Sequence, residues 1–224
     1  MGECITPRRE RPGITAGLLA IEGAHALDDD PANVEVVADA GFRMMSPSHF
    51  FDNAFGGSAH GIAKGGLTEA GREMVRRMEA RGMLVDVSHA SAATIDDVVE
   101  MAVRPVVSSH TGVRGVADNA RNLDDAQLRA IAATGGLVGI GFWPTACGGE
   151  GTDAIVRSIR YAVDIAGIDH VALGSDWDGA VRVPFDAAGT VQLTDGLLAQ
   201  NFDEQAMRVI MAGNALRVLG AALP

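Results

Sequence analysis

Short apolar runs alternate with helical patterns along most of the chain, and this alternation restricts the fold more than any other feature. The runs are rich in Val, Ile and Leu and lack strict apolar–polar alternation, which is typical of strands buried on both faces of a parallel sheet. Five runs are clear, over residues 18–21, 83–87, 105–109, 137–142 and 171–174, and a weaker sixth covers 42–46.

Each helical pattern between these runs has a local start or stop signal. Thr68, Ser91, Asp124 and Asp203 can each cap a segment with apolar residues three or four positions apart, and Gly167 closes a further apolar stripe. A strand–helix–strand order of this kind predicts right-handed βαβ units around a parallel sheet. The sequence therefore predicts an α/β fold.

Two α/β architectures compete, an open doubly wound sheet and a (β/α) barrel of the TIM type. An open sheet usually carries a Gly-rich phosphate loop after its first strand, but here that place holds the acidic stretch EGAHALDDD. Polar residues follow several different strands, which favours the barrel, because barrels place catalytic groups at the carboxyl ends of their strands. We expect residues 1–16 to be a leader of unclear structure and 17–224 to form a single, partial barrel domain.

Composition excludes several classes of protein. The 224 residues are 47% hydrophobic and 21% charged, as in globular domains. A formal net charge of −11 argues against nucleic acid as a partner, because phosphate backbones are repelled. No run approaches the roughly 18 apolar residues of a membrane span. The N-terminus lacks a secretory apolar segment, and Cys4 and Cys147 form no CxxC pair, so a cytoplasmic location is expected.

Four side chains suited to metal chemistry follow predicted strands. Glu22, His89, His110 and Asp176 each come at or just after the end of a different apolar run. Carboxylate and imidazole groups are ligands that zinc, and to a lesser degree manganese or iron, prefers. A single histidine at a strand end is more often structural, and a lone aspartate can simply cap a helix. Four such residues at matching places predict a metal-dependent hydrolase.

Longer motifs resemble the membrane (renal) dipeptidase family. The chain contains, in the family's order, IEGAH, LTEAGREMVRRMEARGMLVDVSHAS, RPVVSSHTGVRGVADNARNLDDAQLRAIAATGGLVGIGF, HVALGSDWDG and AGNALRVLG, which together extend over about residues 17–219. The resemblance implies a zinc metallopeptidase on an amidohydrolase-type barrel that hydrolyses dipeptides with metal-activated water. It also implies a small dipeptide as substrate and a homodimer as a possible assembly.

The same resemblance assigns a role to six residues. Glu22 matches the glutamate that bridges two zinc ions, and His89 and His110 match the histidines that complete one zinc site. Arg121 matches the arginine that holds the terminal carboxylate of the dipeptide, a task suited to a planar guanidinium. The remaining two are His49, which matches the histidine that polarises the substrate carbonyl, and Asp176, which matches the acid/base aspartate.

The sequence departs from the family pattern near its start. The family binds the other zinc through a His-x-Asp pair on its first strand, and no His-x-Asp occurs in this sequence. About six strands are predicted where a closed barrel of this type needs eight. We therefore expect an N-terminally truncated barrel. One zinc site would keep its three ligands, Glu22, His89 and His110, and the other would keep Glu22 as its one remaining ligand.

Several explanations and functions stay open at this point. The sequence is a shortened form of a complete enzyme, its missing strands come from another chain, or it is a degenerate homologue that binds metal or a partner without catalysis. Another barrel amidohydrolase, acting on a small amide or lactone, is a further alternative. Among the other polar residues, His170 and Asp178 are expected to be structural, and His25 is expected either to be structural or to support the metal ligands from behind. His60, in the Gly-rich loop over 54–66, is a weaker candidate for substrate contact.

Overall fold

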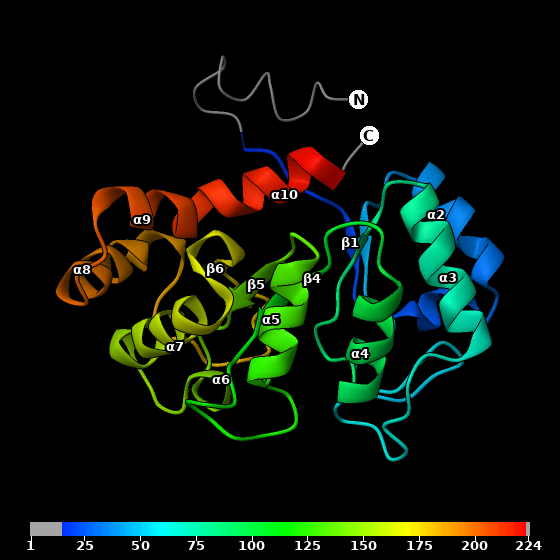
Figure 1. Cartoon of the computed structure of the whole chain (residues 1–224), viewed down its shortest axis with the longest axis horizontal. Helices are drawn as coiled ribbons and strands as arrows, with labels where there is room; N and C mark the ends of the chain where they lie inside the picture. Colours follow the sequence, from blue (N-terminus) through cyan, green and yellow to red (C-terminus); the bar gives the residue numbers. More distant parts are fainter. Residues whose placement is uncertain (1–14, 223–224) are drawn as a thin grey trace. The chain divides into compact units, whose positions relative to one another are not determined.

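The computed structural model describes residues 15–222, which form two compact units (Figure 1). The first unit comprises residues 15–106 and 216–222, and the second comprises 107–215. Each unit contains a three-stranded sheet in which every strand pair is parallel. The α/β class and the parallel strands are thus confirmed. Closure into one barrel, and a single domain over 17–224, stay predictions.

The sheet of the first unit has the order β1-β2-β3. Its strands are β1 (Ala20–Ile21), β2 (Met44–Met45) and β3 (Leu84–Val85). The connections contain the 3-10 turns η1 (Ala24–Leu27) and η2 (Pro31–Asn33) and the helices α2 (Val34–Asp39) and α3 (Glu69–Ala80), and α4 (Ala92–Met101) follows β3. Ile21 is level with Met45, and Met45 with Val85, so the carboxyl ends of the three strands are in line.

The helices of the first unit begin where the sequence predicts. Thr68 accepts a hydrogen bond from Gly71 N–H at the start of α3, and Ser91 accepts one from Thr94 N–H at the start of α4. These caps satisfy backbone donors that have no partner inside the helix. One face of α3 then packs into the core with the fully buried residues Met74, Val75 and Met78.

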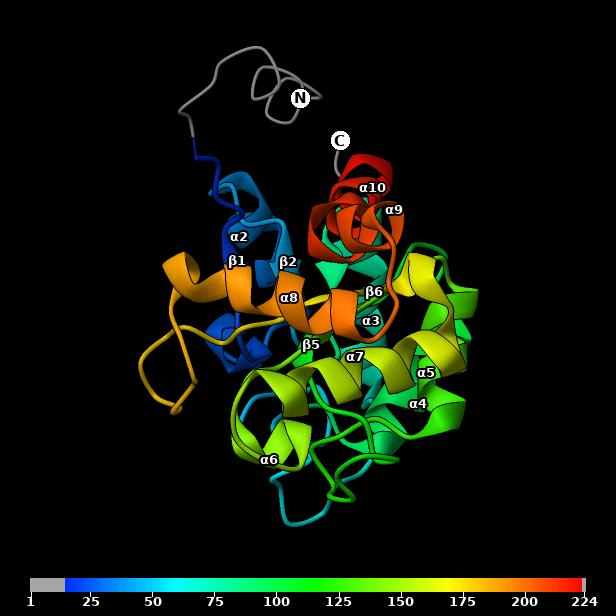
Figure 2. The ribbon, with the colours of Figure 1, turned by 90° about the vertical axis from the view of Figure 1, so that its left-hand side faces the viewer.

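The sheet of the second unit has the order β4-β5-β6. Its strands are β4 (Val107–Thr111), β5 (Leu137–Ile140) and β6 (Val171–Leu173). The other elements are α5 (Asp125–Ala133), α6 (Pro144–Cys147), α7 (Thr152–Ala166), η3 (Ile168–His170), η4 (Ala187–Thr190), α8 (Val191–Ala199), α9 (Glu204–Arg208) and the π-helical turn η5 (Val209–Gly213). The last helix, α10 (Asn214–Ala222), begins in the second unit, and its residues from Leu216 onward belong to the first. Figure 2 shows α7 and α8 lying side by side, and the two helices are in contact.

Hydrogen bonds from polar side chains stabilise the starts of two helices in the second unit. Asp124 and Gln127 form a capping box at the start of α5, in which each side chain accepts from the backbone N–H of the other residue. At the start of α10, Asn214 is 2% exposed, and its Nδ2 donates to the carbonyls of Ile168 (2.7 Å) and Val171 (2.8 Å). The asparagine therefore ties α10 to the beginning of β6.

All six predicted strands are present, although most are shorter than their apolar runs. β4 is an exception, because it extends past its predicted end through His110 to Thr111. Thr111 pairs with Ile140 after a shift in the register between Ser108 and Thr111. The five predicted helical segments are also present. The sequence analysis did not predict four further helices, α2, α6, α8 and α10.

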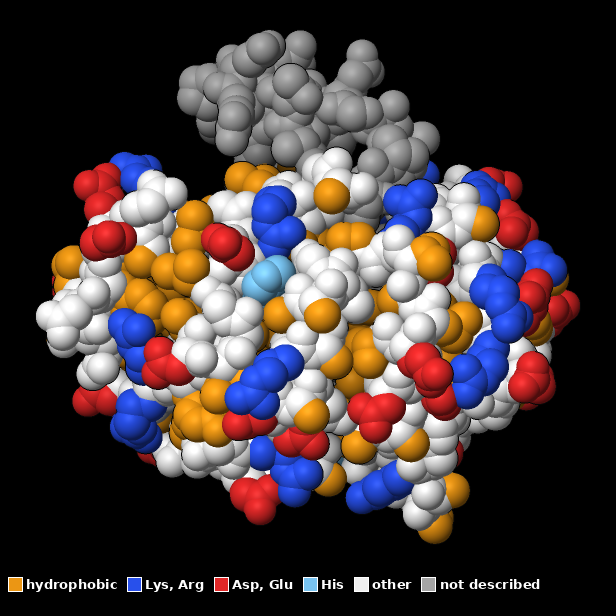
Figure 3. Space-filling model, in the orientation of Figure 1, with side chains coloured by type: hydrophobic (Ala, Val, Ile, Leu, Met, Phe, Trp, Pro, Cys, Tyr) orange, Lys and Arg blue, Asp and Glu red, His pale blue; other side chains and the backbone are white. Residues whose placement is uncertain are grey.

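The surface over α2 and α3 carries interleaved acidic and basic side chains, which Figure 3 shows at the right-hand edge of the face. Arg77 forms an ion pair with Glu73 at 2.8 Å, and Arg81 pairs with both Glu35 and Asp39. The Arg81 pairs link the end of α3 to α2, whereas the Arg77–Glu73 pair lies within α3. Within residues 15–222, no helix has the length and apolar character needed to cross a membrane.

Candidate metal centre

Glu22 is the first residue after β1, and its neighbours fix the direction of the chain there. Ser46 N–H donates to Ile21 O at 3.0 Å, and Gly23 N–H donates to Ser46 Oγ at 2.8 Å. Gly23 has a φ of 103°, and a Cβ at this position would lie 2.6 Å from His25 Nδ1. Only glycine fits this backbone conformation without strain. Gly23 therefore allows the chain to turn directly after Glu22.

Two histidines follow the neighbouring strands β2 and β3 at equal spacings in the sequence. His49 comes four residues after Met45, and His89 comes four residues after Val85, which is paired with Met45 in the register. Each of the two loops thus places an imidazole near Glu22. His89 has a φ of 64°, which is rare for a residue with a side chain and is found more often at functional sites.

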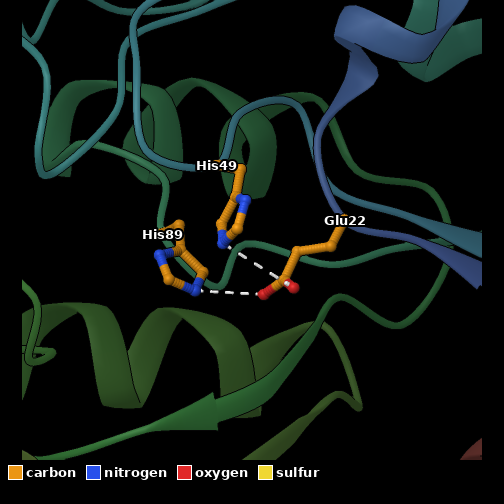
Figure 4. Close-up of side chains that lie close together, drawn as sticks. All are labelled: Glu22, His49 and His89. Atoms are coloured by element: carbon orange, nitrogen blue, oxygen red, sulfur yellow. Dashed lines mark ion pairs between the residues drawn. The ribbon is translucent and has the colours of Figure 1, made fainter. Parts of the chain in front are cut away.

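The three side chains converge so that each oxygen of one carboxylate faces a different imidazole (Figure 4). His89 Nε2 lies 3.0 Å from Glu22 Oε1, and His49 Nε2 lies 3.7 Å from Glu22 Oε2. One ligand atom from each residue lies within 4.8 Å of the others. The imidazole rings of His49 and His89 meet edge to face, with their centres 4.4 Å apart.

The three side chains lie close enough together to hold one metal ion, and zinc can be compared with them. Zinc bonds to nitrogen and oxygen are about 2.0–2.1 Å long, so neighbouring ligands of a tetrahedral ion lie about 3.4 Å apart. Here the separations are 3.0 Å from His89 Nε2 to Glu22 Oε1 and 3.7 Å from His49 Nε2 to the other oxygen, Oε2, so each imidazole faces its own carboxylate oxygen. The Glu22 side chain is 43% exposed and His49 25%, while His89 is 10% exposed. The cluster is therefore anchored on its His89 side and open to solvent on its Glu22 side.

The loop after β2 holds the backbone of both histidines. Ser58 Oγ donates to the carbonyl of His49, and Ala59 N–H donates to the carbonyl of His89 at 2.8 Å. Two adjacent loop residues therefore fix the relative positions of two potential ligands. The predicted loop over 54–66 is present and ordered by hydrogen bonds.

Asp52 organises this loop from its other side. Its carboxylate accepts from the backbone N–H groups of Ser58 (2.8 Å), Ala63 (2.8 Å) and Lys64 (3.3 Å). These donors, that of Ser58 most strongly, lower the pKa of the Asp52 carboxyl below its ordinary value. A Cβ at Gly57 would lie 2.2 Å from Gly65 O, so glycine at position 57 allows the two parts of the loop to approach closely.

Two further rings surround the histidines. The ring of Phe50 lies 3.9 Å from that of His49 and 5.5 Å from that of His89. The ring of His60 lies 5.3 Å from both Phe50 and His89. The sequence analysis missed Phe50, whose only signal is its place directly after His49. His60 does lie beside the cluster, and its contact with substrate stays a prediction.

In the second unit, His110 and Arg121 are neighbours. Arg121 donates from its guanidinium to the carbonyl of His110 at 2.7 Å, and Thr111 Oγ1 donates to the carbonyl of Arg121 at 3.2 Å. The indole ring of Trp143 lies 5.8 Å from the ring of His110 and 5.7 Å from the guanidinium carbon of Arg121. Trp143 is a second residue that the sequence analysis missed, because its contacts depend on the pairing of β4 with β5.

Asp176 follows the end of β6 by three residues and has a φ of 60°. Two other polar residues near β6, both expected to be structural, have hydrogen-bond contacts to the backbone. Asp178 accepts from Ala180 N–H at 2.7 Å within the loop, and His170 Nδ1 lies 2.9 Å from Gly136 O.

The structure thus brings together three of the six predicted site residues, Glu22, His49 and His89. His49 lies close enough to Glu22 to be a ligand, although the resemblance gave it a role toward substrate. His110, Arg121 and Asp176 belong to the second unit. The individual roles of all six residues stay predictions.

A parallel α/β fold with a Glu–His–His cluster beyond its strand ends is the arrangement expected of an amidohydrolase-like metallopeptidase. The chain belongs to the membrane dipeptidase family, peptidase family M19, whose model matches residues 7–223. The resemblance found in the sequence is thereby confirmed.

Individual relatives agree with this assignment. The chain is 35% identical over 222 residues to an uncharacterized protein in the pqqA 5' region of Klebsiella pneumoniae, an alignment that covers 92% of this chain and 82% of that protein. It is similar to the solved structure of the dipeptidase AC, a family M19 metallopeptidase, with 31% identity, a TM-score of 0.86 and coverage of 94% of this chain and 65% of that chain.

A third relative was solved with a ligand. It is a metallopeptidase from Rhodobacter sphaeroides liganded with a phosphinate mimic of the dipeptide L-Ala-D-Ala. The similarity has 29% identity and a TM-score of 0.80, and covers 94% of this chain and 64% of that chain. The present chain therefore spans slightly less than two thirds of these two solved chains.

Proposed function

We propose that this protein is a zinc-dependent dipeptidase that cleaves the peptide bond of a dipeptide with water. The observation that carries the proposal is the convergence of His49 and His89 on the two oxygens of Glu22, in a chain that belongs to the membrane dipeptidase family. Anionic oxygen together with neutral imidazole nitrogen is the donor set that catalytic zinc uses.

The residues of the centre would hold zinc in defined protonation states. Glu22 supplies negative charge, and His89 binds through Nε2 only when its imidazole is neutral, so metal affinity falls under acidic conditions. Bound zinc polarises a carbonyl and lowers the pKa of its water to about 7. By resemblance to the family, His110 would be a further ligand to this zinc.

The remaining predicted residues would act on the substrate. His49 donates a hydrogen bond to the oxygen of the scissile carbonyl as negative charge develops there. Asp176 accepts a proton from the attacking water and delivers it to the leaving nitrogen as the C–N bond breaks. Arg121 binds the free carboxylate of the dipeptide, which restricts the substrates to short peptides with a free C-terminus.

The substrate class is supported by the ligand of the Rhodobacter sphaeroides relative, which mimics L-Ala-D-Ala. The test compares turnover of L-Ala-D-Ala and L-Ala-L-Ala by protein stripped of metal and by protein reloaded with zinc. We expect turnover only after reloading, and its loss in His89→Ala. His25→Ala is the matched control, because His25 lies in η1, outside the cluster, and is exposed.

Three results would contradict the proposal in different ways. Full turnover without metal, or in His89→Ala, would show that the reaction does not need zinc bound at this site. Hydrolysis of a small cyclic amide or lactone without dipeptide turnover would show a different amidohydrolase. Zinc binding without turnover of any of these compounds would show a homologue that binds metal but is not a catalyst.

A further inference from the structure

A pocket of ≈ 320 Å³ lies in the second unit, beyond the carboxyl ends of β5 and β6. We propose that it receives an apolar side chain of the substrate's C-terminal residue and so determines specificity. This inference rests on the proposed dipeptidase function and adds a preference that the family assignment does not contain. The volume is within the lower range of small-molecule sites.

The lining of the pocket is mainly apolar. Phe142, Pro144, Val183 and Pro184 supply apolar surface, and the remaining lining residues are Glu150, Gly151 and Arg182. Glu150 and Arg182 are exposed and of opposite charge, and within residues 15–222 neither forms a hydrogen bond or an ion pair. Since both charged groups can stay hydrated, burial of apolar surface remains the main source of binding energy in the pocket.

A three-ring cluster shapes one wall of the pocket. Trp177 donates from its indole N–H to the carbonyl of Phe185 at 2.8 Å, which closes the segment between them into a loop. The ring of Phe142 lies 5.8 Å from that of Trp177 and 5.5 Å from that of Phe185. Figure 2 shows this segment as part of the long yellow-to-orange connection between β6 and α8. The loop therefore presents Val183 and Pro184 at a defined position.

Both walls of the pocket continue directly into residues to which the reaction is assigned. Asp176 immediately precedes Trp177 on the loop side. Phe142 immediately precedes Trp143, whose ring lies near both His110 and Arg121. Arg121 is the proposed partner of the substrate carboxylate, and Phe142 is joined through Trp143 to the surroundings of Arg121, so we assign this pocket to the side chain of the C-terminal residue of the dipeptide.

The test measures kcat/KM of zinc-loaded protein for Ala-Leu, Leu-Ala and Ala-Ala. We expect the unmodified protein to prefer Ala-Leu over Ala-Ala by about 10-fold or more, the discrimination that a hydrophobic pocket provides. Val183→Phe fills the pocket and should reduce the ratio of Ala-Leu to Ala-Ala by a similar factor. Val191→Phe is the matched control, because Val191 is 63% exposed at the start of α8 and does not line the pocket.

The outcomes separate this inference from the proposed function. An unchanged ratio in Val183→Phe, or a change confined to Leu-Ala, would overturn the inference while dipeptidase activity stands. If the unmodified protein turns over no dipeptide, the proposed function fails, and calorimetric Kd values for the same three dipeptides test the pocket alone. Tighter binding of Ala-Leu that Val183→Phe abolishes would support the pocket, and equal Kd values would overturn it.

Discussion

His89 Nε2 lies 3.0 Å from Oε1 of Glu22, with its imidazole largely buried and the carboxylate partly in solvent. This pairing makes Glu22 the first residue to test for metal binding. Glu22→Gln keeps the shape of the side chain but removes its charge. Zinc affinity should fall by more than the roughly 10–100-fold that loss of a supporting partner costs. Competition titration with a chromophoric chelator measures it.

His25→Ala is again the control, since it removes an exposed imidazole three residues from Glu22 that is outside the cluster. It should leave the zinc Kd unchanged. Equal zinc affinity of Glu22→Gln and the unmodified protein would show that the cluster is not the metal site.

Asp52 provides a pH-dependent test of the loop that carries Ser58 and Ala59. Because backbone donors lower the pKa of Asp52, its stabilising effect is complete above the ordinary carboxyl range near pH 4 and is lost as the pH falls through the lowered value. Asp52→Asn should reduce the free energy of unfolding by about 1 kcal/mol at pH 7, after allowance for solvent screening. The difference between the two proteins should shrink at about pH 3.

Urea unfolding at both pH values measures the effect of this substitution. Asp195→Asn is a suitable control, because Asp195 is an exposed residue of α8 without a hydrogen bond among the described residues. A difference for Asp52→Asn that stays constant with pH would mean that the charge of Asp52 does not stabilise the loop.

Cys147 should be unreactive in the folded protein. Burial raises the pKa of its thiol to about 11, and its Sγ contacts Gly141 O at 2.9 Å. Thiolate is the reactive form, so alkylation by iodoacetamide at pH 8 should be slow in the folded Cys4→Ser variant and fast in urea. The raised pKa also predicts that stability is complete below pH 9.0 and declines as the pH rises toward 11. Equal alkylation rates with and without urea would contradict the burial of this thiol.

Among the polar residues at the start of α10, Asn214 should lower the free energy of unfolding most when it is substituted. Asn214→Asp replaces the Nδ2 donor with a carboxylate oxygen that faces the carbonyls of Ile168 and Val171. We expect a loss of about 2–3 kcal/mol in the free energy of unfolding, because two acceptors lose their partner and a charge is buried. Asn201→Asp, at an exposed position with a φ of 60°, should stay within about 0.5 kcal/mol.

Local signals made much of the fold predictable from the sequence. Thr68, Ser91 and Asp124 are caps as expected, because a cap and the apolar spacing after it lie within a few residues. The meeting of Glu22 with His89 was also predictable, since parallel strands end at the same edge of a sheet. Helices such as α8 were missed because no cap side chain marks their start.

The parts that could not be predicted depend on contacts between distant segments. His49 joins the cluster because the two-residue strand β2 lies between β1 and β3, and its sequence signal is weak. The place of Phe50 depends on the path of the loop that Asp52 holds. Trp143 meets Arg121 only after β4 and β5 have paired.

The equal four-residue spacing from Met45 to His49 and from Val85 to His89 makes the length of both segments a condition for the cluster. Removal of Pro47 or Val87 would shift one imidazole along its loop relative to the other, and Glu22 could then no longer face both. Natural or engineered variants that keep the centre should therefore not gain or lose residues in these two segments, and they should also keep the buried Ser46 that accepts from Gly23 N–H.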